Sequence, residues 1–148
     1  VSSRVPVSNQ LKALKKVVDY KTLAMIFNPL EPNSIIQRDV AIQLGRTMGF
    51  QLNPLPLTSP EEIHQVVARL KTGADAVFFP SDSMINSLGK RLTHSVNQMK
   101  LPSLAAVESM VLHDNALMGL VPDYYDLGIL AAKKALKIIS QFVILCII

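Results

Sequence analysis

Polar side chains with hydroxyl, amide or carboxylate groups follow several short apolar runs of this sequence. The apolar runs cover residues 23–27, 76–79, 104–107 and 116–121. The polar candidates that follow them are Asn28, Glu31, Asn33, Ser34, Ser81, Asp82, Ser83, Glu108, Asp123 and Tyr124. Groups of these types hold a small polar molecule by hydrogen bonds and charge. They form no recognisable catalytic or metal-ligating set, so the pattern predicts ligand binding without chemistry.

Some of these residues also have a structural interpretation as helix caps. Asn33 or Ser34 is expected to cap the helix over residues 34–48, Ser83 or Asp82 the helix over residues 83–98, and Asp123 the last expected helix. A capping side chain accepts a hydrogen bond from a backbone N–H of the first turn. The two interpretations are compatible, because the start of a helix also presents free N–H groups and a positive dipole end that attract a carboxylate.

The carboxylates and tyrosines leave further alternatives open. Asp82 can pair with an ammonium group or be solvated, whereas Glu31 and Glu108 can contact a ligand or be surface charges. Of the adjacent Tyr124 and Tyr125, one ring can stack on a ligand while the other packs inward. An amino acid or similar zwitterion fits these groups, with its ammonium group near Asp82 or Glu31.

Alternating strands and helices must position these residues. Strands are expected over residues 22–27, 50–57, 75–79, 102–107 and 116–121. Helices are expected over residues 9–18, 34–48, 60–70, 83–98, 109–113 and 124–140. The alternation repeats about every 25 residues, which is typical of an α/β fold with a doubly wound parallel sheet. A single domain over residues 1–148 is expected, because a chain of this length can bury a sizeable core.

Pro54 and Pro56 place the second strand at an edge of the sheet, because proline donates no hydrogen bond to a strand ladder. The flavodoxin-like strand order 2-1-3-4-5 satisfies this requirement. In that order the first and third strands are neighbours whose connections leave toward opposite faces, and ligands bind outside such a switch point. The loops at residues 28–34 and 80–83 are therefore predicted to face one crevice.

The sequence lacks the residues that several classes of function require. Asn28-Pro29 follows the first strand in place of a glycine-rich phosphate loop, so a nucleotide site is not expected. The histidines stand apart and Cys146 lies in an apolar tail, which favours neither a nucleophilic triad nor a metal site. The net charge is +4, but no basic stripe carries interleaved aromatic residues, which argues against nucleic-acid binding. We expect no enzyme activity and no cofactor.

The ends of the chain predict self-association. We expect no signal peptide within the chain, and the apolar tail Phe142–Ile148 is too short to span a bilayer. The tail is uncharged and favours strand structure, so it can add to a sheet edge. We expect a homodimer or larger assembly through the chain ends, including the helix over residues 9–18, because large exposed apolar patches are unusual in monomers.

Several longer motifs carry a family resemblance. They are Gln10-Leu11 and residues 25–34 (MIFNPLEPNS), 58–63 (TSPEEI), 74–82 (ADAVFFPSD), 101–103 (LPS) and 116–128 (ALMGLVPDYYDLG). With these motifs the chain resembles the substrate-binding proteins of ABC transporters, which have the type I periplasmic-binding fold. It is most similar to the branch described as uncharacterised or aromatic amino-acid binding.

The resemblance implies a solute-binding component that holds a small ligand, such as an amino acid, and works with an ABC permease in the periplasm or at the outer side of a membrane. It implies that residues 19–115 form the core of a second lobe, and that residues 1–18 and 116–148 pack on the first lobe. The apolar tail departs from the polar continuation of the family, so a partial chain is expected. Two alternatives remain: the effector-sensing domain of a transcription regulator, and a structural domain that has lost its ligand.

Overall fold

The computed structural model describes residues 5–145, with all of their side chains except those of Tyr124, Leu127 and residues 137–145. The chain divides into two compact units, and the single domain expected over residues 1–148 stays a prediction. The first unit, Val5–Val121, carries the sheet and the helices that cover it, and the segment from Pro122 onward belongs to the second unit. The lobe boundaries expected after residues 18 and 115 stay a prediction.

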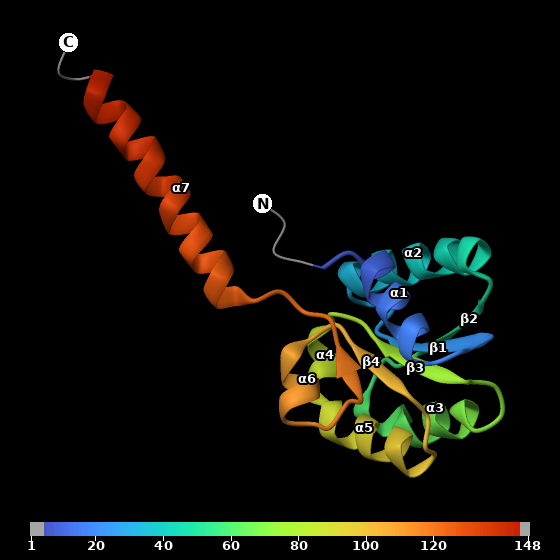
Figure 1. The fold of residues 1–148 in the computed structure, drawn as a ribbon. Helices are drawn as coiled ribbons and strands as arrows, with labels where there is room; N and C mark the ends of the chain where they lie inside the picture. The colour runs from blue at the N-terminus through green and yellow to red at the C-terminus, as the bar shows by residue number, and fades with distance from the viewer. Residues whose placement is uncertain (1–4, 146–148) are drawn as a thin grey trace. The chain divides into compact units, whose positions relative to one another are not determined.

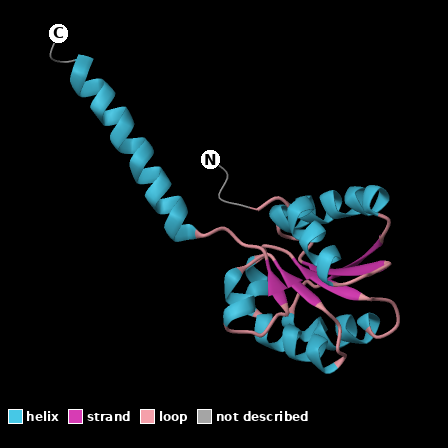
Figure 2. Cartoon of the chain, viewed as in Figure 1, coloured by secondary structure: helices cyan, strands magenta, loops and turns pink. Residues whose placement is uncertain are grey.

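A five-stranded parallel sheet forms the centre of the first unit. Its strands are β1 (Thr22–Phe27), β2 (Gln51–Pro56), β3 (Ala76–Phe79), β4 (Ser103–Ala105) and β5 (Met118–Gly119). Their order is β2-β1-β3-β4-β5, which confirms the predicted order, and Figure 2 shows helices on both sides of the sheet. Pro54 and Pro56 lie on the edge strand β2, in register with Met25 and Phe27 of β1.

Helices connect the strands and cover both faces of this sheet. They are α1 (Val7–Val17), α2 (Pro32–Met48), the 3-10 turn η1 (Pro60–Glu62), α3 (Ile63–Leu70), α4 (Ser83–Ser87), α5 (Gly89–Gln98) and α6 (Glu108–Leu112). In Figure 1, α1 and α2 lie on one face, whereas α3, α4, α5 and α6 lie on the other. The single helix expected over residues 83–98 is divided at Leu88, whose backbone leaves the helical region with ψ of 5°.

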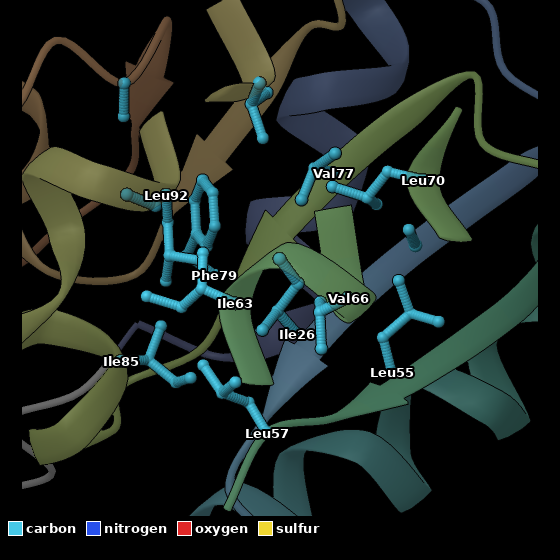
Figure 3. Packing of buried hydrophobic residues seen from close by; sticks show 14 of the residues in the cluster. Ile26, Leu55, Leu57, Ile63, Val66, Leu70, Val77, Phe79, Ile85 and Leu92 are labelled. Carbon is cyan, nitrogen blue, oxygen red and sulfur yellow. The ribbon is translucent and has the colours of Figure 1, made fainter. Parts of the chain in front are cut away.

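Two clusters of buried apolar side chains fill the two faces of the sheet. Alternate residues of β1 enter different clusters, as the pleat of a strand requires, so Met25 and Ile26 are buried on opposite faces. Figure 3 shows the cluster that contains Ile26, together with Val66 of α3 and Phe79 of β3. The strands are thus buried on both sides, which explains why their sequences are continuous apolar runs rather than alternating ones.

The apolar face of α1 is covered within the same unit. Leu11 and Leu14 are fully buried in one cluster with Phe78 of β3. The apolar face of this helix was expected to be covered by a second copy of the chain, but α1 packs directly on the sheet. The last strand, β5, is also paired with a neighbour, since Met118 lies in register with Leu104 of β4.

The last helix is longer than the sequence predicted. This helix, α7, runs from Tyr124 to Leu145, so residues 142–145 are helical and do not form the strand that the tail was expected to add to a sheet. The final residues of the expected tail, Cys146–Ile148, lie outside the described residues. Within residues 5–145, no helix combines the length and apolar character that crossing a membrane requires.

Candidate functional site

The loops that follow β1 and β3 lie against each other at the carboxyl end of the sheet. The two strands are neighbours, and α2 and α4 leave them toward opposite faces (Figure 1). The backbone N–H of Asn28 donates hydrogen bonds to Oγ of Ser34 over 3.2 Å and to Oδ2 of Asp82 over 3.1 Å. The structure thus joins the two segments that the sequence analysis selected from topology.

Gln37 also holds this junction together, although it was not among the candidate residues. Its Oε1 accepts a hydrogen bond from the N–H of Ser81 over 3.1 Å, and its Nε2 donates to the Ser81 carbonyl over 3.3 Å. Nδ2 of Asn33 donates to the same carbonyl over 2.8 Å. Gln37 follows Asn33 by one helical turn, so the polar pair at spacing i, i+4 was the signal that could have identified it.

Asp82 is buried at this junction, with 3% of its surface exposed. Oδ1 accepts the N–H of Ile85 over 2.9 Å and thereby caps α4, while Oδ2 accepts the N–H of Asn28. The sequence left pairing with an ammonium group and solvation as alternatives for this carboxylate. The burial excludes solvation, and the two backbone donors give the buried charge the partners that it needs.

Glu31 connects the same two loops, and Oε2 of this residue accepts a hydrogen bond from the N–H of Ser83 over 3.0 Å. Ser83 is exposed and begins α4. Glu31 is therefore more than a surface charge, because its carboxylate holds the start of α4 next to the start of α2.

The helix caps differ in part from those expected. α2 begins at Pro32 with Glu31 in the N-cap position and no side-chain cap, so neither Asn33 nor Ser34 has the predicted capping role. Ser34 is instead fully buried and accepts the hydrogen bond from Asn28 described above. The Ser34 hydroxyl therefore binds the beginning of its own loop at Asn28 and not the first turn of α2.

The loop that follows β4 lies next to the loop that follows β3. The N–H of Ala106 donates to the carbonyl of Phe79 over 2.9 Å, and Oγ of Ser109 donates to Oδ1 of Asn86 over 2.7 Å. Glu108 immediately precedes Ser109, begins α6 and is exposed. Within the described part of the chain, its side chain makes no hydrogen bond and no ion pair.

The last two candidates belong to the second compact unit. Oδ1 of Asp123 accepts the N–H groups of Tyr125 over 2.9 Å and Asp126 over 3.1 Å, which is the capping role expected of it. The side chain of Tyr124 lies outside the described residues. A contact of either residue with a ligand stays a prediction.

A surface groove lies apart from these loops, over α1 and the end of α2, and is lined by Lys12, Lys15, Lys16 and Met48. Nζ of Lys15 donates to the Met48 carbonyl over 2.8 Å and lies 5.1 Å from the ring centroid of Tyr20. Lys15 thus satisfies a carbonyl at the end of α2, where a cation is also favoured by the helix dipole. These contacts give the groove a structural explanation.

The chemistry available at the candidate loops is that of hydrogen bonding and charge. Among residues 5–145, no group of three or more histidine, cysteine, aspartate or glutamate side chains is placed to hold a metal ion. The site residues brought together are amides, hydroxyls and carboxylates, several of which are engaged with the backbone. Such an arrangement can bind and orient a polar molecule.

A protein-family model matches most of the chain. The model for ABC transporter substrate binding protein matches residues 1–141. The chain belongs to this family. Members of the family are substrate-binding proteins rather than enzymes, and the fold of the chain matches those of solved substrate-binding proteins.

Individual relatives cover much of this chain but less of their own length. The tyrosine-binding protein of Clostridioides difficile is 26% identical over 120 residues, which are 81% of this chain and 34% of that protein. An ABC domain from Streptococcus pneumonia, solved in complex with L-Trp, has a TM-score of 0.76 and 24% identity, and the match covers 91% of this chain and 47% of that one. A substrate binding protein with adhesive properties from Clostridium difficile, solved in a ligand-free, open structure, has a TM-score of 0.82 and 25% identity. The match covers 94% of this chain and 47% of that one. The chain thus spans about a third of the curated relative and about half of the solved ones.

Proposed function

We propose that this chain contributes to the amino-acid site of an ABC-transporter substrate-binding protein. The observation that carries the proposal is the hydrogen-bonded junction between the β1–α2 and β3–α4 loops, at the switch point where open α/β sheets bind ligands. The tyrosine-binding relative and the fold shared with a structure containing L-Trp support an amino acid as the ligand. The same proposal includes an ABC permease as the partner of the protein, and a location outside the cytoplasm.

The junction suits a zwitterion in particular. The 17-residue helix α2 begins at Pro32 beside the junction, and its dipole favours a carboxylate near Asn33. Asn28, Ser81 and Ser83 add polar groups along the same edge. A single lobe covers only one side of a ligand, so we expect a Kd of about 1 mM, equivalent to about −4 kcal/mol.

Nuclear magnetic resonance titration of the isotope-labelled chain with L-tryptophan tests this site. Amide signals of the non-proline residues among 28–34, and of residues 81–83, should shift with a common Kd, while those of Lys12 and Lys16 in the separate groove should not. A neutral sugar at the same concentrations controls for nonspecific effects. A panel of amino acids that moves none of the junction signals would instead support the alternative of a structural domain without a ligand.

We also propose that the chain self-associates through α7. Every described side chain from Tyr125 to Leu136 is exposed. Tyr125, Ile129, Ala132 and Leu136 recur at the alternating four- and three-residue spacing with which two helices pack in a coiled coil. An exposed apolar stripe of this kind is unfavourable in water, and a second copy of the chain presents a matching stripe.

A further inference from the structure

The backbone of Ser81, in the loop that follows β3, is held by side chains of α2. The carboxamide of Gln37 accepts a hydrogen bond from the Ser81 N–H over 3.1 Å and donates one to the Ser81 carbonyl over 3.3 Å. Paired residues of antiparallel strands exchange two bonds in the same way. Nδ2 of Asn33 donates to the same carbonyl over 2.8 Å. Both backbone polar groups of Ser81 are therefore bonded to α2.

Gln37 is itself fixed, which makes it suitable for holding a loop in one position. It is only 9% exposed, and its Nε2 donates a second bond, over 3.3 Å, to the carbonyl of Asn33 one turn earlier in α2. Both N–H groups of the carboxamide are thus used. A buried amide whose groups are satisfied in this way restricts the motion of the segments that it connects.

The hydroxyl of Ser81 is the polar group of this residue that the fold leaves available. Ser81 is half-buried, and within the described residues its Oγ makes no hydrogen bond. A hydroxyl can both donate and accept a hydrogen bond. A group that is already held in place binds a ligand more tightly, because no loop has to be ordered during binding.

We propose that Gln37 is a positioning residue of the amino-acid site, which holds Ser81 so that the Ser81 hydroxyl binds the amino acid; the inference rests on the proposed function. Gln37 does not contact the ligand in this assignment. Its two bonds to the Ser81 backbone transmit its effect, so the affinity for an amino acid depends on Gln37 only while the Ser81 hydroxyl is present.

Gln37→Glu tests this role, because the hydrogen bonds of the introduced carboxyl group change with pH. The protonated group has a donor and an acceptor for Ser81, as the carboxamide has, whereas the ionised group has no donor for the Ser81 carbonyl. At pH 8 we expect a Kd for L-tryptophan about fivefold above that of the unchanged chain, which is the effect of one hydrogen bond. At pH 4.5, where burial favours the protonated form, the ratio of the two Kd values should return to near one.

Two further variants separate the lost bonds from the added charge. Gln37→Met removes both bonds without a charge, and should weaken binding about fivefold at both pH values. Gln43→Glu makes the charged substitution at an exposed position of the same helix, and should leave the Kd unchanged. Circular dichroism confirms that each variant is folded. The proposal is overturned if neither Gln37 variant changes the Kd, or if Gln43→Glu raises it equally.

Ser81→Ala decides whether Gln37 acts through Ser81. This variant alone should weaken L-tryptophan binding about fivefold, and Gln37→Met combined with Ser81→Ala should bind no more weakly than either single variant. Losses that multiply to about 25-fold in the double variant, or no loss from Ser81→Ala, would overturn the assignment and leave the amino-acid site standing. If the unchanged chain binds no amino acid, the proposed function fails and this inference fails with it.

Discussion

An aspartate joins β3 to β1 at each end of β3, but the two aspartates have different surroundings. Before β3, Asp75 is exposed, and its Oδ2 accepts the N–H groups of Lys21 over 2.9 Å and Thr22 over 2.8 Å. After β3, Asp82 is buried and accepts the N–H groups of Ile85 and Asn28. Hydrogen bonds from backbone N–H groups to an aspartate thus connect β1 to β3 at both ends of β3. The aspartate is exposed to water before β3 and buried after it.

The difference shows which connection the fold depends on. Water can replace an exposed carboxylate at the N–H groups that it binds, so its loss has a small effect on stability. A buried N–H group that loses its acceptor pays the full desolvation penalty. The carboxyl edge therefore contains the more rigid junction, and this is also the edge at which parallel sheets bind ligands.

The largest effect is expected from Asp82→Ala. This substitution leaves the buried N–H of Ile85 without its acceptor and removes the bond to Asn28, whose N–H keeps only Ser34 as acceptor, and should reduce the free energy of unfolding by about 2 kcal/mol. Urea denaturation followed by circular dichroism measures the loss. Asp75→Ala is the matched control at the other edge and should cause a clearly smaller loss. Equal losses in the two variants would contradict the comparison.

A smaller, pH-dependent effect is expected from Asp75. Hydrogen bonds from the N–H groups of Thr22 and Lys21 lower the pKa of this carboxyl below its ordinary value of 3.8. A lowered pKa in the folded state means that the charged carboxylate stabilises the fold above pH 3.8, and that this contribution is lost as the pH falls through the folded pKa.

This contribution is measured by comparing the free energy of unfolding of the unchanged chain with that of Asp75→Asn between pH 7 and pH 2. The two stabilities should differ near neutral pH and converge in acid, because a protonated aspartate and an asparagine are both neutral. A difference that stays constant over the whole range would show that the bonds do not depend on the charge of Asp75.

The smallest effect on stability is expected in α7, whose exposed side chains belong to neither of the two connections between β1 and β3. Leu136 is 67% exposed, so Leu136→Gln should change the free energy of unfolding by less than about 0.5 kcal/mol. The same variant should weaken self-association in sedimentation velocity, because Leu136 lies on the proposed stripe. Leu130→Gln changes an exposed leucine away from that stripe and should leave association unchanged. A clean monomer at high concentration of the unchanged chain would refute the proposed interface.

The strand order could be predicted from the sequence because its signals are local. Pro54 and Pro56 exclude a central position for β2, and continuous apolar runs such as residues 76–79 indicate strands buried on both faces. Signals for ends of elements were less reliable. Nothing in the periodicity of residues 83–98 marked the division at Leu88, and the β-favouring composition of residues 142–145 gave no indication of the helix that forms there.

The sequence by itself determined the α/β class, the strand order and the two loops at the switch point, because these follow from periodicity, proline and apolar runs read within short windows. Only the tertiary structure decided which polar groups remain available to a ligand. Asn28 meets Asp82 across 54 residues, and Ser81 meets Gln37 across 44. Such long-range hydrogen bonds give several predicted ligand contacts a structural role, whereas within the described residues the Glu108 side chain makes neither a hydrogen bond nor an ion pair. Hydrogen-bond donors and acceptors are shared between distant segments, so their availability is a property of the packed chain and not of any one window of sequence.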